Sequence, residues 1–239
     1  MNIAKIQDAD TSYESFAEEY LSKVDEKPYN IYYERPAMIS ELGDVAKKNA
    51  LDIGCGSGYY SEWLSKNGAS VTAVDLSPKM VSYTQSRCGS KVNSLICDVS
   101  KPMPQFSEKT FDILLASLVM HYIKDWKAAL GEFKRILKPS GSFIFSVHHP
   151  IQDYVYFSRS NYYQIELIED EWKGFSKPFK VKYYVRPLNE IMKPLIENGF
   201  KIQSFSEPKP VMQCREKFPK LYEKLSSEPA FLIIKASRE

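Results

Sequence analysis

The chain has 239 residues, of which 44% are hydrophobic, 13% aromatic and 26% charged. This composition is that of a folded globular protein, and it excludes intrinsic disorder, collagen-like repeats and low-complexity scaffolds. Lys and Arg total 32 against 30 acidic residues, which gives a formal net charge of +2. So small an excess of positive charge argues against a dedicated binder of nucleic acid or of a membrane surface.

The four cysteines are Cys55, Cys88, Cys97 and Cys214, and they show no C-x-x-C spacing. The N-terminus has no cationic stretch followed by an apolar one, and no apolar run approaches the roughly 18 residues of a membrane span. We therefore expect a reduced, cytoplasmic protein without a membrane segment.

Strand and helix patterns alternate between residues 47 and 148. This alternation predicts a mostly parallel sheet with right-handed crossovers and helices on both faces. The predicted strands cover residues 50–53, 70–74, 92–96, 111–116 and 142–147. Helices are expected over 59–66, after an N-cap at Ser77, and after an N-cap at Asp125 until Pro139 and Gly141.

Two segments differ from this alternating core of residues 47–148. Residues 1–46 are rich in Tyr and are expected to form a helical cover. Residues 151–185 interrupt the alternation with aromatic text and a predicted turn at 170–174, and we interpret them as a substrate lid, because Tyr and Trp cover ligands at little entropic cost. Residues 186–239 return to a helix and two closing strands, so residues 1–239 are expected to form one domain.

A glycine-rich loop, LDIGCGSG at residues 51–58, joins the first predicted strand to a helix. Glycines allow a tight turn and let a ligand touch main-chain atoms, and Asp75 ends the next strand, where an acid can accept both hydroxyls of a ribose. Dinucleotides and S-adenosylmethionine both suit this arrangement. However, Tyr59 stands where the dinucleotide fingerprint requires glycine, and Asp52 would repel a pyrophosphate but attract an ammonium group.

In these motifs the chain resembles the class I S-adenosylmethionine-dependent methyltransferases. Their five motifs match residues 51–60, 71–76, 97–99, 111–120 and 137–142 in order. The text FAEEY at residues 16–20 is similar to the covering helix of the branch that includes quinone- and biotin-pathway enzymes. The resemblance implies a Rossmann-like α/β fold with seven strands in the order 3-2-1-4-5-7-6, the seventh antiparallel. It also implies S-adenosyl-L-methionine as cofactor and S-adenosyl-L-homocysteine as product.

The resemblance assigns residues to a cofactor site. These are Tyr20, Asp52, Gly54, Cys55, Gly56, Asp75, Leu76, Asp98, Val99 and Ser117. Asp52 would steer the ammonium group of the methionine part, and Ser117 would lend it a backbone carbonyl. Asp75 would hold the ribose hydroxyls, Asp98 would accept from the adenine amino group, and Tyr20 would close the site.

All three histidines follow predicted strands. His121 comes after the fourth strand, and His148 and His149 end the fifth, at the edge where open α/β sheets bind ligands. Imidazole has an unperturbed pKa near 6.5 and can take a proton at neutral pH. We therefore expect His121 and His148 to be catalytic, with structural roles as the alternative. No spacing of Cys or acidic residues completes a metal site, so we expect none.

The expected function is methyl transfer to a small, partly apolar molecule, without a nucleic-acid or membrane partner. The acceptor atom, the pathway and the oligomeric state stay open. The alternatives are a methyltransferase that modifies RNA or protein, a non-catalytic nucleoside-binding regulator of the same fold, and a dinucleotide oxidoreductase. Tyr59 and Asp52 disfavour the last of these.

Overall fold

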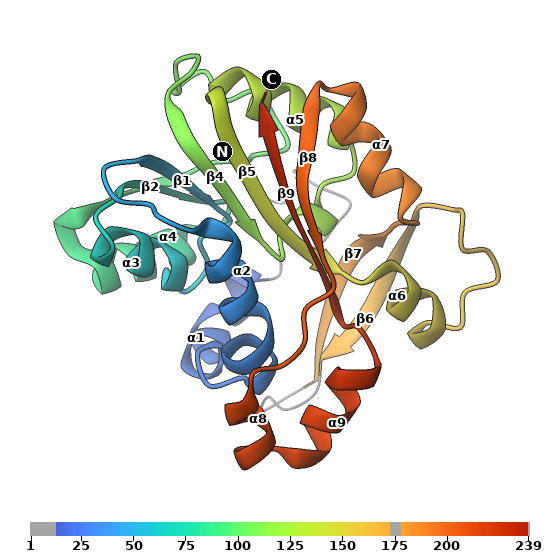
Figure 1. Cartoon of the computed structure of the whole chain (residues 1–239). Coiled ribbons are helices and arrows are strands. Elements are labelled where there is room, and N and C mark those ends of the chain that lie inside the picture. The colour runs from blue at the N-terminus through green and yellow to red at the C-terminus, as the bar shows by residue number, and fades with distance from the viewer. Residues whose placement is uncertain (1–12, 173–177, 239) are drawn as a thin grey trace.

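The structure is a computed structural model of the chain, and it describes residues 13–172 and 178–238. A seven-stranded sheet forms its centre (Figure 1). Its strands are β1 (Asn49–Ile53), β2 (Ser70–Asp75), β3 (Val92–Ile96), β4 (Phe111–Ser117), β5 (Leu137–His148), β8 (Phe200–Ser206) and β9 (Phe231–Arg238).

The strand order is β3-β2-β1-β4-β5-β9-β8. Counted among the strands of this sheet alone, that order is 3-2-1-4-5-7-6, which confirms the expected topology. The pairs from β3 to β5 are parallel, whereas β9 runs antiparallel to both of its neighbours.

Helices cover both faces of the sheet (Figure 1). Those packed against it include α2 (Arg35–Leu42), α3 (Tyr59–Lys66), α4 (Pro78–Cys88), α5 (Trp126–Ile136) and α7 (Asn189–Glu197). Because neighbouring side chains of a strand point to opposite faces, β5 serves two cores. Phe143 and Phe145 pack with the residues of α5 and α7, and Ile144 between them packs with those of α2 and α3.

The predicted helix starts are confirmed. The side chain of Ser77 accepts a hydrogen bond from the amide of Met80, and that of Asp125 accepts one from the amide of Ala128. The start of β5 was predicted too late. Leu137 already pairs with Phe111, and pairing resumes at residue 142, so the residues between them form a bulge inside the strand.

The insertion between β5 and the closing elements contains α6 (Pro150–Tyr156), β6 (Glu166–Trp172) and β7 (Phe179–Val185). Strands β6 and β7 pair antiparallel as a separate two-stranded sheet. The turn predicted at 170–174 is wrong for residues 170–172, which continue β6, and residues 173–174 lie outside the described part.

In its described part, the N-terminal cover contains α1 (Tyr13–Val24), the π-helical turn η2 (Asn30–Glu34) and α2, which confirms its helical character there; residues 1–12 of the predicted cover lie outside the described part. The cover lies at the end of the sheet where β4 and β5 finish, and α8 (Met212–Lys217), α9 (Pro219–Ser227) and the β6–β7 hairpin lie at the same end (Figure 1). Among the residues that the structure describes, none of the helices has the length and apolar character of a membrane span.

The N-cap of α5 gives a direct test of this local structure. Replacing Asp125 with Ala removes the acceptor of the Ala128 amide, so we expect the free energy of unfolding to fall by about 1 kcal/mol. Asp125→Asn keeps an acceptor and serves as the control. Urea denaturation measures both variants, and an Asp125→Ala protein as stable as the control would contradict the cap.

Candidate functional site

A cavity of about 750 Å³ opens at the carboxyl ends of the parallel strands. It lies where the strand order reverses between β1 and β4, the position at which open α/β sheets bind ligands. Its walls come from the N-terminal cover, the loops after β1 to β4, the end of β5 and strand β6. Segments distant in sequence therefore line one cavity.

The structure brings nearly all of the predicted site residues to this cavity. Those that line it are Tyr20, Gly54, Cys55, Gly56, Asp75, Leu76, Asp98, Val99, Ser117, His121 and His148. Asp52 is the exception. No group of three or more His, Cys, Asp or Glu side chains suited to a metal ion occurs in the described ranges.

The glycine loop passes close to its neighbours on one side and leaves space on the other. Gly54 has a φ of 68°, and a Cβ there would collide with the side chain of Val119. Gly56 has a φ of 50°, and the nearest atom to a Cβ there, the Gly54 carbonyl oxygen, is 3.9 Å away. Both positions favour glycine, and the backbone of Gly56 faces the cavity.

Asp75 is held at the cavity wall by the loop itself. Its Oδ2 accepts from the amide of Gly56 at 3.0 Å, and its Oδ1 accepts from the amide of Ser77 at 2.9 Å. On the next strand end, Oδ1 of Asp98 accepts from the amide of Ser100 at 3.1 Å. The two carboxylates are thus oriented by backbone donors of the loops that form the cavity.

Asp52 lies behind the glycine loop. Its side chain accepts from the hydroxyl of Ser61 on α3 at 2.6 Å and is fully buried, and burial raises its pKa to about 7. Strand alternation sends this side chain toward α3, away from the cavity. Asp52 therefore does not touch a ligand in the cavity, and steering by its charge alone stays a prediction.

Glu34, which belongs to none of the sequence motifs, is a buried carboxylate that does line the cavity. It ends η2 and is 2% exposed. Its Oε2 accepts from the hydroxyl of Tyr60 at 2.6 Å, and its Oε1 accepts from the hydroxyls of Ser117 at 2.8 Å and Ser146 at 2.7 Å. Burial raises the pKa of Glu34 despite these three donors.

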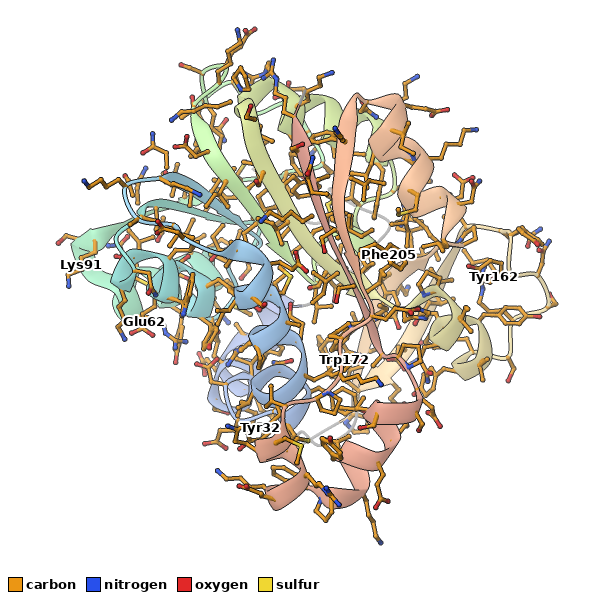
Figure 2. The ribbon with its side chains drawn as sticks, viewed as in Figure 1. Tyr32, Glu62, Lys91, Tyr162, Trp172 and Phe205 are labelled. Carbon is orange, nitrogen blue, oxygen red and sulfur yellow. The ribbon has the colours of Figure 1, made fainter. Side chains whose placement is uncertain are left out.

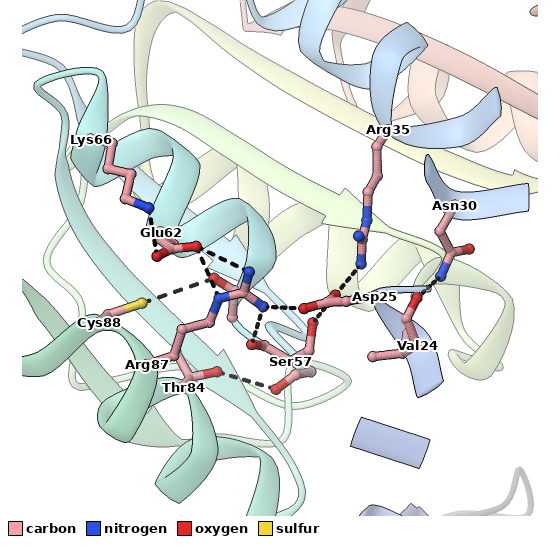
Figure 3. A network of polar contacts seen from close by, with 12 residues as sticks. Val24, Asp25, Asn30, Arg35, Ser57, Glu62, Lys66, Thr84, Arg87 and Cys88 are labelled. Atoms are coloured by element: carbon pink, nitrogen blue, oxygen red, sulfur yellow. Dashed lines mark hydrogen bonds and ion pairs between the residues drawn. The ribbon is translucent and has the colours of Figure 1, made fainter. Parts of the chain in front are cut away.

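Arg35 follows Glu34 and also lines the cavity. Its Nη2 donates to Oδ1 of Asp25 at 2.6 Å, and its guanidinium carbon lies 3.7 Å from the centroid of the Tyr59 ring. Oδ2 of Asp25 accepts from Arg87 at 2.6 Å (Figure 3). Burial opposes the ionisation of Asp25, but the two arginines outweigh it and hold its pKa below the usual value.

The histidine end of the cavity is tightly packed. The rings of His121 and His148 stack with their centroids 4.6 Å apart, and the ring of Tyr183 meets both edge-on. Burial lowers the pKa of His121 well below its usual value and that of His148 to about 4. Burial thus moves both rings away from the ordinary imidazole pKa near 6.5 on which their expected role as bases was argued, and their catalytic role stays a prediction.

His121 also contains an unsatisfied atom. Its ring is 5% exposed, and its Nδ1 is buried without a hydrogen-bond partner among the described residues. A buried polar nitrogen without a partner costs free energy, and a ligand with a complementary group removes that cost.

Strand β6 supplies the remaining wall. Trp172 lies near the centre of the molecule, whereas Tyr162 lies at the outer edge of the insertion (Figure 2). The indole Nε1 of Trp172 donates to Oδ2 of Asp170 at 3.0 Å, and Nζ of Lys27 lies 5.0 Å from the centroid of the Trp172 ring. Burial, with Lys23 nearby, lowers the pKa of Lys27 to about 8.

The raised pKa of Asp52 predicts a pH-dependent stability. An unfolded Asp ionises near pH 3.8, and the folded pKa is about 7, so stability from this group is present at acidic pH and lost as pH rises to 7. The side chain of Asp52→Asn cannot ionise. The free energy of unfolding of this variant, relative to that of the wild type, should therefore rise by a few kcal/mol between pH 4 and 8, at about 1.4 kcal/mol per pKa unit.

Urea denaturation across this pH range measures the difference, in which the other titrating groups cancel. Asp44→Asn, at an exposed acid outside the cavity, is the control and should show no such trend. A constant difference between Asp52→Asn and the wild type would mean that Asp52 ionises with an ordinary pKa.

Comparisons with known proteins agree with this geometry. Residues 51–145 match the family described as a methyltransferase domain. An uncharacterized protein of Haemophilus influenzae is 29% identical over 231 residues, covering 87% of this chain and 88% of that protein. The malonyl-(acyl-carrier protein) O-methyltransferase of Serratia marcescens is 37% identical over 97 residues, which are 40% of this chain and only 36% of that enzyme.

A ubiquinone biosynthesis O-methyltransferase of Pelagibacter ubique is 27% identical over 73% of this chain and 77% of its own length. A crystal structure from Listeria monocytogenes, provisionally assigned as an S-adenosylmethionine-dependent methyltransferase, superposes with a TM-score of 0.75. It is 25% identical and covers 86% of this chain and 96% of its own. With the ordered motifs and the cavity at the switch point, these similarities support a class I S-adenosylmethionine-dependent methyltransferase, whose methyltransferase domain is matched over residues 51–145.

Proposed function

We propose that this enzyme moves the methyl group of S-adenosyl-L-methionine to a small, partly apolar acceptor bound between the strand-end histidines and strand β6. The observation that carries this proposal is a continuous cavity of about 750 Å³. Its donor half is the part lined by the glycine loop and by the acids at the strand ends, and its aromatic half is the part lined by Tyr, Trp and Phe side chains. Sites for small molecules span roughly 300–1,000 Å³, so this cavity has room for the donor and a second small molecule.

The residues of the donor half fit the donor. The backbone of Gly56 leaves the space that a side chain would fill, and the Asp75 carboxylate is oriented beside it to accept from ribose hydroxyls. Leu76 and Val99 line the wall on which the adenine would pack, next to Asp98. When bound, the donor supplies a methyl group on a positively charged sulfur.

The aromatic half suits an acceptor with an apolar body. Tyr29, Tyr122, Trp172 and Phe231 line it. Transfer of a methyl group requires the acceptor atom, the methyl carbon and the sulfur to lie in line, so holding the acceptor in one orientation supplies most of the rate. The neutral rings of His121 and His148 hold the molecule to be methylated by accepting a hydrogen bond from one of its N–H or O–H groups. This positioning is the catalytic role that the low pKa values of the two histidines favour.

The names of the relatives support the small acceptor. The Serratia protein is named for a malonyl group on an acyl-carrier protein, and the Pelagibacter protein for ubiquinone biosynthesis, so the acceptors of the two proteins differ. The match to the methyltransferase domain covers residues 51–145, which excludes both the N-terminal cover and the β6–β7 hairpin. We infer that these two segments select the acceptor of this enzyme.

The four cysteines are free, which supports a reducing, cytoplasmic location.

Radioactive methyl-labelled donor tests the proposal without knowledge of the acceptor. A cell extract is separated into small molecules, RNA and protein, and each fraction is incubated with enzyme and labelled donor. The proposal expects label in the small-molecule fraction. Label in RNA or protein alone would contradict it, and the absence of transfer with intact donor binding would favour a nucleoside-binding regulator.

Asp75→Ala tests the donor half. Loss of a charged acceptor for the ribose hydroxyls should weaken binding of S-adenosylhomocysteine by about 1.5–3 kcal/mol. Isothermal titration measures this affinity, with Asp44→Ala at an acid outside the cavity as the control. If Asp75→Ala bound S-adenosylhomocysteine normally, the ribose would lie elsewhere.

Trp172→Ala tests the aromatic half. Because Trp side chains dominate binding in desolvated pockets, we expect the KM for the acceptor to rise by roughly tenfold or more, with the Kd for S-adenosylhomocysteine unchanged. Tyr163→Ala, in the same insertion but 79% exposed and outside the cavity, is the matched control. Equal losses of acceptor and donor affinity would instead show that Trp172 is structural.

A further inference from the structure

We propose that Asp153 is a positioning residue that keeps the hydrogen of the neutral His148 ring on Nδ1, so that Nε2 of His148 accepts a hydrogen bond from the molecule to be methylated. His148 lines the cavity, whereas Asp153 does not and acts through His148. The inference rests on the function proposed above, and it adds the residue that sets the hydrogen-bonding character of the aromatic half.

The turn from β5 into α6 brings the two side chains together. His148 is the last residue of β5, His149 is the N-cap of α6, and Pro150 begins the helix. The amide of Asp153 donates to the carbonyl of His149 at 3.0 Å, which places Asp153 in the first turn of α6. Oδ1 of Asp153 lies 3.8 Å from Nδ1 of His148. This distance exceeds that of a hydrogen bond, and contacts between catalytic groups tighten when the substrate binds.

The contact joins a carboxyl group to a neutral ring. Burial lowers the pKa of His148 to about 4, so the ring carries one hydrogen at neutral pH. A neutral imidazole has one donor and one acceptor nitrogen, and the bond made by one nitrogen fixes the state of the other. Nδ1 faces Asp153, outside the cavity lining, which leaves Nε2 on the other side of the ring for the cavity. An ionised carboxylate only accepts, so it selects Nδ1–H and makes Nε2 an acceptor.

Aromatic neighbours hold the His148 ring in this orientation. It stacks on the ring of His121 with the centroids 4.6 Å apart, and the ring of Tyr183 meets it edge-on at 4.7 Å. The ring of Phe231 stacks on it at 6.0 Å. Because these contacts restrict rotation of the ring, the position of its hydrogen decides which group the cavity meets. His121 differs in that its Nδ1 has no hydrogen-bond partner among the described residues.

The charged groups around Asp153 come from several elements. Burial raises the pKa of Asp153 to about 7, although Arg159, after α6, lowers it, and Asp170 of β6 raises it. Burial also raises the pKa of Tyr183 on β7, so this side chain is neutral, as is His148 on β5. Asp153 is therefore the group of this cluster that changes its charge near neutral pH.

This ionisation reverses the hydrogen-bonding character of the ring. Above pH 7 the Asp153 carboxylate accepts from Nδ1–H of His148, and Nε2 accepts from the cavity. Below pH 7 the protonated carboxyl group donates to Nδ1, so the hydrogen of the ring moves to Nε2, which becomes a donor. An acceptor molecule held through its own N–H or O–H group is therefore bound in the higher pH range.

NMR of protein labelled with ¹⁵N in its histidines measures the tautomer and requires neither methyl donor nor acceptor. Protonated and unprotonated ring nitrogens differ in chemical shift, and the spectrum of His148→Gln identifies the signals of His148. In the wild type we expect the hydrogen on Nδ1 at about pH 8.5 and on Nε2 at about pH 5.5. The midpoint should lie near pH 7. A ring with its hydrogen on Nε2 throughout this range would overturn the proposal.

Variants identify the group that causes the step. Asp153→Asn cannot ionise, so its His148 signals should show no step near pH 7. Asp153→Leu is similar in size and lacks an acceptor, so His148 should carry its hydrogen on Nε2, the form that a free histidine ring favours. Asp52→Asn should keep the step, although the pKa of Asp52 is also about 7. Glu207→Gln is the matched control, because Oε1 of Glu207 lies 2.7 Å from Nε2 of His149 outside the cavity, and it should change the His149 signals alone.

Methyl transfer separates positioning from a structural role. With labelled donor and the small-molecule fraction of the cell extract, the wild-type rate should rise as the pH increases through 7. Asp153→Asn should lower the rate by roughly tenfold or more and remove this rise, with the Kd for S-adenosylhomocysteine unchanged. Glu207→Gln should keep the wild-type rate and profile.

A step retained in the His148 signals of Asp153→Asn, or a wild-type rate and pH profile in that variant, would overturn the proposal. If neither Asp153 variant folds, the wild-type titration of the His148 tautomer still decides. Absence of methyl transfer by a wild type that shows the expected tautomer step would contradict the proposed function and leave the role of Asp153 supported.

Discussion

The cavity depends on the docking of the N-terminal cover against the carboxyl edge of the sheet, and buried polar contacts hold that docking. Among the side chains of the cover that the structure describes, Ala17 and Leu21 of α1 pack on Met80, and α2 adds its own apolar contacts with the sheet. In addition, Glu34 bonds to hydroxyl groups on α3, β4 and β5, and Asp25 bonds to Arg87 of α4. Apolar surfaces can slide, whereas buried charges lose several kcal/mol when they lose their partners, so these contacts specify one position of the cover.

This arrangement links the cover to the ligand. A ligand that contacts the cover and the glycine loop at once stabilises the docked state by its own binding free energy. Asp75 orients on the glycine loop through Gly56, and Asp25 bonds to the hydroxyl of Ser57 in the same loop. The loop is therefore the common neighbour of the cover and of Asp75, the proposed ribose site.

Much of this site follows from local sequence rules. Strong signals gave α3 and β3 their observed bounds, and the caps at Ser77 and Asp125 form as their residue types predict. The glycine loop and the acids at strand ends lie together because carboxyl ends of parallel strands meet at one edge. Those features need only the strand pattern and the chain order.

The remaining features depend on tertiary structure. β1 is buried on both faces, so its apolar run does not tell which face Asp52 takes. The π-helical turn that carries Glu34 has no sequence signature, and its hydroxyl partners lie 26, 83 and 112 residues away. The pKa values of the histidines depend on burial, which the insertion and its Tyr183 complete.

The neutral histidines limit the chemistry that the acceptor half can perform. A base with a pKa of about 4, as burial gives His148, is a weak acceptor for a proton from a phenol or an ammonium group. An acceptor nitrogen or oxygen that is already deprotonated at neutral pH, or a nitrogen with a free lone pair, needs no such transfer. For these acceptors a buried neutral imidazole is useful as a fixed hydrogen-bond partner, and the packing of His121 on His148 and Tyr183 keeps that partner in place.

The sulfonium of the donor loses its charge as the methyl group leaves, so a strong anion at that point would oppose the reaction. The carboxylate of Glu34 is instead bonded to the hydroxyl of Ser117, at the expected place of the ammonium group, whose charge does not change during transfer.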